Sequence, residues 1–152
     1  MRQWLVKKAL QRYWRLTRAL TLGVQGVVFD DAGQVLLVRH GYRPGWHFPG
    51  GGVEANETIQ VSLERELKEE AGVEIASPPQ LLGIYANFRS FPSDHIALFV
   101  LDEWRQPTVP KPNAEIAEID FFDQSGLPEG TVPAVHRRLR EIADNSPISP
   151  DW

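Results

Sequence analysis

The chain has 152 residues, 42% of them hydrophobic, which is the size and composition of one globular domain with its own core. It holds no run of 18 or more apolar residues, which excludes a typical membrane-spanning helix, and no cysteine, which excludes disulfides and leads us to expect a cytoplasmic location. The net charge is −4, and because residues 1–20 carry six basic side chains and no acid, the remainder carries −10, which argues against a DNA-binding surface on the body of the protein.

Residues 1–20 are predicted to form an amphipathic helix. One half of this helix is apolar, and the other half is basic, with Lys7, Lys8, Arg12, Arg15 and Arg18. Such a helix can lie on an anionic membrane, contact RNA phosphates or act as a transit peptide. We expect instead that its apolar half packs on the domain or on a second copy of the chain in a homodimer, because the helix leads almost directly into the first predicted strand.

The next segments read as strands. Two β-rich runs, 21–29 and 34–39, are joined by turn-forming residues at 30–33, which predict a hairpin. A short extended piece follows at 46–48. The three glycines at 50–52 then supply backbone that can bend sharply and approach a ligand closely.

The rest of the chain alternates between helix and strand patterns. The sequence predicts a helix at 58–71 closed by Gly72, strands at 80–87, 95–104 and 118–122, and a C-terminal helix that Thr131 and Pro133 open and Asn145 and Pro147 end. We therefore expect a helix at 1–20, one domain at 21–145 and a C-terminal tail at 146–152.

The most informative stretch runs from Gly51 to Val73. On the predicted helix, Glu66, Glu69 and Glu70 stand at positions i, i+3 and i+4, so three carboxylates share one face. Like charges at these spacings destabilise a helix, and a divalent cation would offset their repulsion. Oxygen ligands of this kind suit Mg²⁺ or Mn²⁺ rather than zinc. The alternative is an acidic helix face that is simply solvated.

The same stretch resembles the Nudix box, G-x5-E-x7-R-E-U-x-E-E-x-G-U with U a bulky aliphatic residue, and fills every defined position of it. The resemblance implies an α+β fold, the Nudix α/β/α sandwich with a mixed β-sheet. It also implies a Mg²⁺-dependent hydrolase, with Mn²⁺ as a substitute, that cleaves the phosphoanhydride of a nucleoside diphosphate linked to another group X. Nucleoside triphosphates, nucleotide sugars and ADP-ribose all stay open as substrates.

The resemblance also implies roles for individual residues. The metal ligands would be oxygen donors of the motif, namely Glu66, Glu69, Glu70, Glu57 and Gly51. Glu57 would be either a peripheral ligand or an orienting partner. Arg65 would be structural and pair with Glu57 or Glu69, because its planar fork suits bidentate contact with a carboxylate.

The general base is the least defined role, since its position differs among members of the family. Glu66 and Glu69 are candidates within the helix, and Glu115 and Glu118 are candidates near the last predicted strand. Outside the motif we expect Glu118, because acidic residues near that strand recur as metal or base residues in the family.

Substrate contacts are expected from the loops. Aromatic side chains would stack on a nucleobase and arginines would reach phosphates, the candidates being Arg39, Tyr42, Arg43, Trp46, Phe88, Arg89 and Phe91. For each aromatic residue, packing in the core is the alternative. The histidines, His40, His47, His95 and His136, show no metal-ligand spacing and are read as ordinary residues.

Two other functions stay open at this stage. The basic segment at 1–20 is the only sequence support for an RNA 5′ pyrophosphohydrolase or decapping enzyme. A non-catalytic nucleotide sensor would usually have lost glutamates of the motif, and this sequence keeps all of them.

Overall fold

The computed structural model describes residues 11, 13, 14 and 17–152. Most of the helix expected at 1–20 therefore lies outside the described residues. Of its described apolar side chains, Tyr13 is 60% exposed and Trp14 is 44% exposed, so both are largely open to solvent. No helix in the described part of the chain is both long and apolar enough to cross a membrane.

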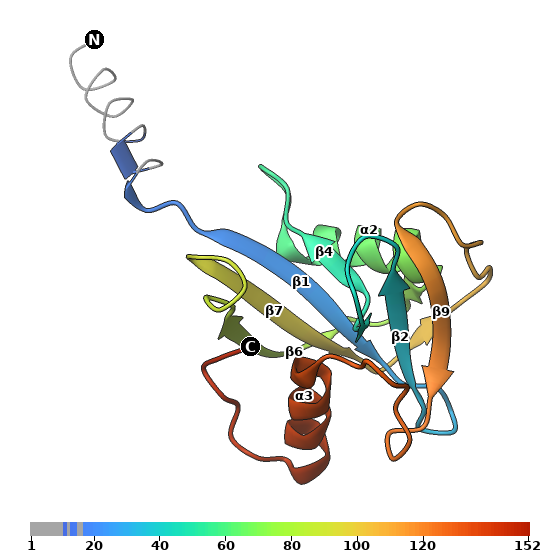
Figure 1. Ribbon diagram of the computed structural model, residues 1–152. Coiled ribbons are helices and arrows are strands. Elements are labelled where there is room, and N and C mark those ends of the chain that lie inside the picture. The colour runs from blue at the N-terminus through green and yellow to red at the C-terminus, as the bar shows by residue number, and fades with distance from the viewer. Residues whose placement is uncertain (1–10, 12, 15–16) are drawn as a thin grey trace.

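A four-stranded mixed sheet forms the centre of the fold (Figure 1). In spatial order its strands are β4 (Gly50–Gly52), β1 (Thr21–Val28), β7 (Asp94–Leu101) and β6 (Gln80–Ala86). The β1–β7 pair is parallel, whereas β4 and β6 pair antiparallel with their neighbours. The expected mixed sheet is thereby confirmed.

Two smaller sheets complete the β-structure. One is antiparallel and consists of β3 (Trp46–His47), β2 (Val35–His40) and β9 (Ile116–Phe122). The other pairs β5 (Glu74–Ile75) with β8 (Trp104–Arg105).

The predicted hairpin at 30–33 is only partly correct. Its turn forms, since the Asp30 N–H donates to the Gln34 carbonyl over 3.0 Å. Beyond the turn, β1 and β2 share only the bridge between Phe29 and Val35 and then enter different sheets. The reason is that both edges of β1 are already occupied, one by β4 and the other by β7, so no edge is left for β2.

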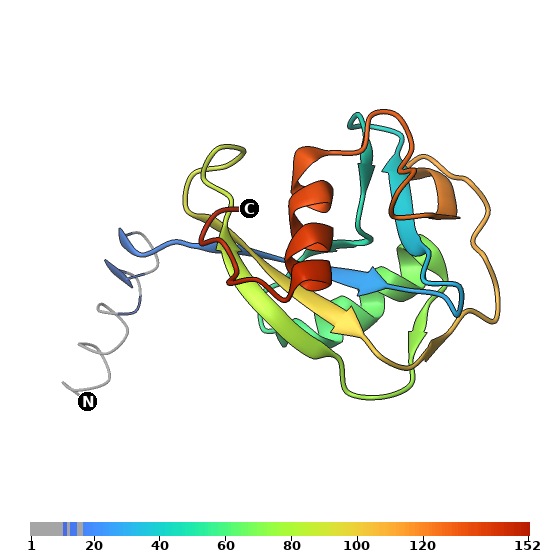
Figure 2. The same cartoon turned by 90° about the horizontal axis from the view of Figure 1, so that it is seen from below.

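The helices α2 (Ile59–Ala71) and α3 (Pro133–Asp144) cover opposite faces of the central sheet (Figures 1 and 2). A hydrophobic core lies on each face of the sheet, and alternate residues of β1 point into one core or the other. Val24 and Val28 pack with Leu67 of α2, whereas Val27 packs with Val135 of α3. This alternation follows from the two-residue period of a strand. Because β1 is buried on both faces, the predicted α/β/α sandwich is confirmed.

Both ends of α2 form as the sequence predicts. The Val61 N–H donates to the Thr58 hydroxyl over 3.2 Å, which caps the first turn. Gly72 ends the helix with φ of +67°, and a Cβ there would lie 1.9 Å from the Thr108 carbonyl oxygen, so only glycine fits.

The start of α3 differs from the prediction. Val132, and not Thr131, is the N-cap residue, and it makes no side-chain capping bond. The Thr131 hydroxyl instead donates to the Pro128 carbonyl over 2.7 Å. The predicted end is confirmed, since Asn145 adopts the left-handed conformation there with φ of +46°.

Part of the expected C-terminal tail packs on the folded body. The Trp152 N–H donates to the Ala86 carbonyl over 2.9 Å at the end of β6. The guanidinium of Arg138, which is 1% exposed, donates to the Asp151 carbonyl over 2.8 Å. The chain's last residues therefore cover the region between α3 and the end of β6 (Figure 2).

The contact between Leu67 and β1 predicts a large loss of stability on truncation. Leu67 is 0% exposed, and its methyl groups would lie 3.0 and 3.1 Å from a Cβ added at Gly26. We expect Leu67→Ala to lower the free energy of unfolding by about 2–5 kcal/mol in urea titrations, because it leaves a cavity. Leu81→Ala is the control. Leu81 is 53% exposed, so its truncation should lower the free energy of unfolding much less. Equal losses would contradict this packing.

Candidate functional site

The glycines of β4 lie between β1 and α2. Gly50 has φ of +145°, and a Cβ there would lie 2.1 Å from the Val24 carbonyl oxygen of β1, so no other residue fits. Its N–H donates to a carboxylate oxygen of Glu70 on α2 over 2.7 Å. This bond holds the glycine strand against the helix that carries the acidic residues.

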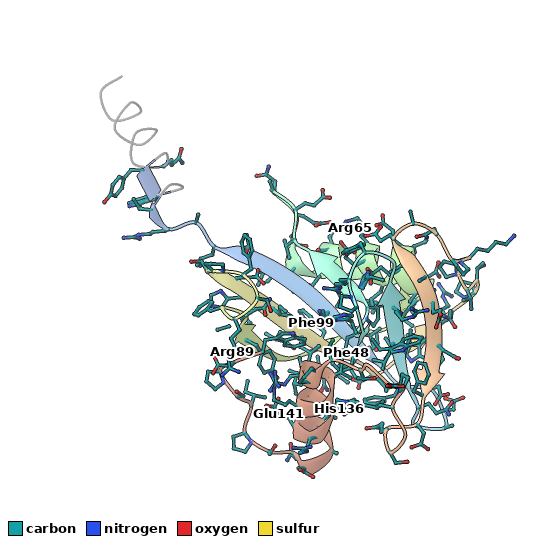
Figure 3. The ribbon with its side chains drawn as sticks, viewed as in Figure 1. Phe48, Arg65, Arg89, Phe99, His136 and Glu141 are labelled. Carbon is teal, nitrogen blue, oxygen red and sulfur yellow. The ribbon has the colours of Figure 1, made fainter. Side chains whose placement is uncertain are left out.

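Arg65 connects the acidic side chains of the motif. Its Nε and Nη2 donate to the two carboxylate oxygens of Glu57 over 3.0 Å each. Its Nη1 donates to Glu66 over 2.6 Å and lies 3.6 Å from a carboxylate oxygen of Glu69. The hydrogen bonds from Arg65 lower the pKa of Glu57 to about 2. Figure 3 shows Arg65 beside α2.

Glu66 and Glu69 differ in their surroundings. The Glu66 side chain is 12% exposed, whereas the Glu69 side chain is 64% exposed. A Cβ at Gly51 would lie 2.5 Å from the Glu66 carboxylate, so this glycine leaves the space that the carboxylate occupies. Burial raises the pKa of Glu66, although its bond to Arg65 acts in the opposite direction.

Glu70 is the most deeply buried acid of the motif, at 3% exposed, and burial raises its pKa to about 8. The His40 Nδ1 lies 3.7 Å from a Glu70 carboxylate oxygen. Burial, followed by the charge of Arg43, lowers the pKa of His40 to about 4. In the protein alone, Glu70 and His40 are therefore both uncharged at neutral pH.

The donor set of the motif fits a hard divalent cation. Carboxylates of Glu57, Glu66 and Glu69 all lie around one guanidinium, and Glu70 lies at the neighbouring Gly50. In residues 11, 13–14 and 17–152, no three acidic or histidine side chains converge closely enough to hold a metal ion. Three of the four acids contact Arg65 instead. Carboxylate side chains need only a change of rotamer to turn toward a cation.

The candidate bases near β9 lie in different places. Arg39 of β2 faces Glu118 of β9 and forms an ion pair with it. The next residue, His40, faces Glu70 on the opposite side of this sheet. Glu118 therefore points away from the motif. Glu115, by contrast, is close enough for its charge to raise the pKa of Glu66 and Glu70.

Two adjoining pockets, together called the groove, lie on β1 beside the glycine strand. One part lies over Gly50–Gly52 and the start of β1, and the other lies between the loop after β6, the start of α3 and the C-terminal residues. The two parts share the residues Gln25, Arg43, Asn87 and Ile96. The groove therefore leads from the motif loop toward the opposite helix.

The structure divides the predicted substrate-binding residues into two groups. Those that line the groove are Tyr42, Arg43, Phe88 and Arg89, and Figure 3 shows Arg89 on the loop after β6. Those that lie outside it are Arg39, Trp46 and Phe91. Trp46 is 8% exposed and packs edge-on against Phe122 with a ring separation of 4.8 Å, so the alternative of core packing holds for it.

Sequence reasoning missed Gln25 and the location of His40. Gln25 occupies the middle of an otherwise apolar strand, and this interruption was a usable signal. His40 carried no such signal, because its proximity to Glu70 arises only when β2 packs beside α2.

Comparison with known proteins identifies the family. Residues 19–141 match the model of the NUDIX domain. The chain belongs to this family. It is a Nudix hydrolase, as the resemblance of Gly51–Val73 predicted, and members of the family generally use divalent metal ions.

Several Nudix relatives share much of the chain. An ADP-ribose pyrophosphatase from Methanocaldococcus jannaschii is 31% identical over 130 residues, which are 82% of this chain and 75% of that protein. An 8-oxo-dGTP diphosphatase from Proteus vulgaris is 35% identical over 92 residues, or 57% of this chain and 80% of that protein. The similarity to an RNA pyrophosphohydrolase from Halorhodospira halophila is shorter, with 51% identity over 47 residues, 31% of this chain and 26% of that protein.

Solved Nudix structures share the fold. The crystal structure of a MutT Nudix hydrolase from Burkholderia pseudomallei superposes with a TM-score of 0.68 at 21% identity, covering 80% of this chain and 97% of that one. The four-stranded mixed sheet between two helices is thus the Nudix sandwich.

The buried state of Glu70 predicts a pH dependence of stability. Its pKa rises from 4.5 to about 8 on folding, so the folded protein retains a proton over this range and stability falls as the pH rises. His40 has the opposite effect, but only between about 4 and 6.5. We expect the free energy of unfolding, measured in EDTA, to fall between pH 6.5 and 8 in the wild type. In Glu70→Gln this fall in stability with pH should largely disappear. An unchanged fall would show that Glu70 is not the group that loses the proton.

Proposed function

We propose that this Nudix hydrolase cleaves the phosphoanhydride of a nucleoside diphosphate linked to a second group, with Mg²⁺ as its metal and Mn²⁺ as a substitute. The observation that carries this proposal is the course of the groove, which passes directly over Gly50–Gly52. A diphosphate lying there would be next to the buried end of Glu66, which packs on Gly51. The proposed diphosphate site and the proposed metal donors would thus be adjacent.

Glu66, Glu69 and Glu70 would hold the metal, together with the Gly51 carbonyl, and Glu57 would be a peripheral ligand. When bound, a divalent cation polarises phosphoryl oxygens and lowers the pKa of an attacking water. Arg65 acts as an orienting residue, because its bidentate contact with Glu57 and its bond to Glu66 hold both acids at the loop. It also neutralises part of their charge before a cation arrives.

Arg43 would bind the substrate phosphates. It lines both parts of the groove, and its Nη2 donates to His40 over 2.7 Å, which fixes the direction of the guanidinium. A fixed arginine loses little entropy when it binds a phosphate. Tyr42, Phe88 and Arg89 lie along the same groove, where they would contact the nucleoside or the second group.

For the general base outside the motif we propose Glu115 in place of Glu118. A base must lie within reach of the attacking water, which in turn must lie near the scissile phosphate. Glu115 is near Glu66 and Glu70, whereas Glu118 is paired with Arg39 on the other face of the β2–β9 sheet.

The substrate class that the comparisons favour is ADP-ribose or a nucleotide sugar, because the ADP-ribose pyrophosphatase is similar over most of the chain. RNA 5′-end hydrolysis is the second candidate. Its support is the short, highly identical match to an RNA pyrophosphohydrolase and the basic composition of residues 1–20. A binding-only sensor has no support, since every acid of the motif is present.

Turnover by the purified protein tests the proposal. With Mg²⁺ and a panel of ADP-ribose, nucleotide sugars, nucleoside triphosphates and 5′-triphosphorylated RNA, we expect release of a nucleoside monophosphate or pyrophosphate from at least one compound. Glu69→Gln combined with Glu70→Gln should lower kcat/KM by about 100-fold or more, because metal binding supplies several kcal/mol to the transition state. Glu64→Gln is the matched control, since Glu64 lies exposed on α2 at an undefined position of the motif. If the wild-type protein turns over no compound faster than the double variant does, the proposed function is refuted.

The two acids near β9 give a paired test of the base. Glu115→Gln should lower kcat by about 100-fold or more, as expected for loss of a general base, with little change in KM. Glu118→Gln should leave kcat nearly unchanged, because its partner is Arg39. The reverse order of effects would restore Glu118 as the base.

A further inference from the structure

Gln25 is a buried polar residue in the middle of β1 and is 8% exposed. Its Oε1 forms no hydrogen bond with any residue that the structure describes. A buried amide without a partner costs free energy that an apolar residue of the same size would not cost. The residues on either side of it, Val24 and Gly26, belong to the packed interior, so Gln25 interrupts the strand at one point.

The position of Gln25 is at the centre of the groove. It pairs with Gly50 of β4 on one side and with Leu98 of β7 on the other. It is among the residues that both parts of the groove share. A group bound to Gln25 would therefore be the first group beyond a diphosphate that lies on Gly50–Gly52.

A second unpaired polar atom belongs to a residue that lines the same part of the groove. Arg43 lines both parts, and although its Nη2 is bonded to His40, its buried Nε has no partner among the described residues. Two residues shared by both parts of the groove, Gln25 and Arg43, thus carry one unpaired acceptor and one unpaired donor. A hydroxyl is the smallest group that donates and accepts at the same time.

We propose that Gln25, with Arg43, binds a ribose hydroxyl of the nucleotide and makes this enzyme selective for ribonucleotides over deoxyribonucleotides. The inference rests on the proposed function, which places the diphosphate on Gly50–Gly52. The sugar is the group joined to the diphosphate, whereas the nucleobase lies one sugar further along the groove. Because a hydroxyl both donates and accepts, it can bind the Gln25 amide in either orientation of that amide.

The direct test is binding of ADP, 2′-deoxy-ADP and 3′-deoxy-ADP in the presence of Mg²⁺, measured by titration calorimetry. We expect wild-type protein to bind ADP about 5- to 150-fold more tightly than the analogue that lacks the contacted hydroxyl, because that analogue leaves the buried amide unpaired. In Gln25→Met, which has similar volume but no amide, this ratio should approach one. Gln25→Glu, which keeps an acceptor at the same length, should restore part of it.

The control is Gln80→Met, the same substitution at an exposed glutamine of β6, which should keep the wild-type ratio. Thermal melting of each variant checks that it is folded. Equal binding of all three nucleotides by wild-type protein would overturn the inference, as would an unchanged ratio in folded Gln25→Met. The inference would also be overturned if Gln25→Met changed the preference among ADP, GDP, CDP and UDP but left the affinity ratio of ADP to its deoxy analogue unchanged. Gln25 would then contact the base.

The same variants separate this inference from the proposed function. If no compound of the turnover panel is hydrolysed but ADP and its deoxy analogues are distinguished through Gln25, hydrolysis fails and ribose selection stands. If a compound is hydrolysed but Gln25→Met leaves the ratio of kcat/KM for ribose and deoxyribose substrates unchanged, the function stands and ribose selection fails.

Discussion

The hydrogen bond from the Gly50 N–H to the buried carboxyl group of Glu70 is the contact on which the site depends. It joins the short strand β4 to α2, while the absence of a side chain at Gly50 lets that strand pair closely with β1. Sheet, glycine strand and acidic helix thus meet at one place. The space over Gly51 that Glu66 occupies, and the floor of the groove, both follow from this arrangement.

The electrostatics of α2 are balanced by one arginine and by burial. Arg65 compensates the charges of Glu57, Glu66 and Glu69 in the absence of a metal ion. Glu70 makes no ion pair with an arginine among the described residues and is stabilised in its neutral form by burial. An incoming divalent ion would therefore compete with Arg65 and with a proton, which links metal binding to both groups.

The groove is assembled from segments that are distant in the sequence. Gln25 comes from the first strand, Arg43 from the loop after β2, Asn87 from the end of β6 and Trp152 from the end of the chain. Loops of this kind carry the differences among enzymes that share one scaffold. The chemistry proposed at Gly50–Gly52 and the proposed choice of substrate would therefore depend on different parts of the molecule.

Local spacing was enough to predict the family, the helix at 58–71 with its ends, and the acids and glycines of the motif. It did not determine that β1 and β2 would separate, that Glu118 would face away from the motif, or that His40 would meet Glu70. Those outcomes depend on which strand edges are already paired and which face of a strand each residue occupies. Both are settled only when the strands pair and pack, because a change of one residue in register moves every side chain of a strand to the opposite face.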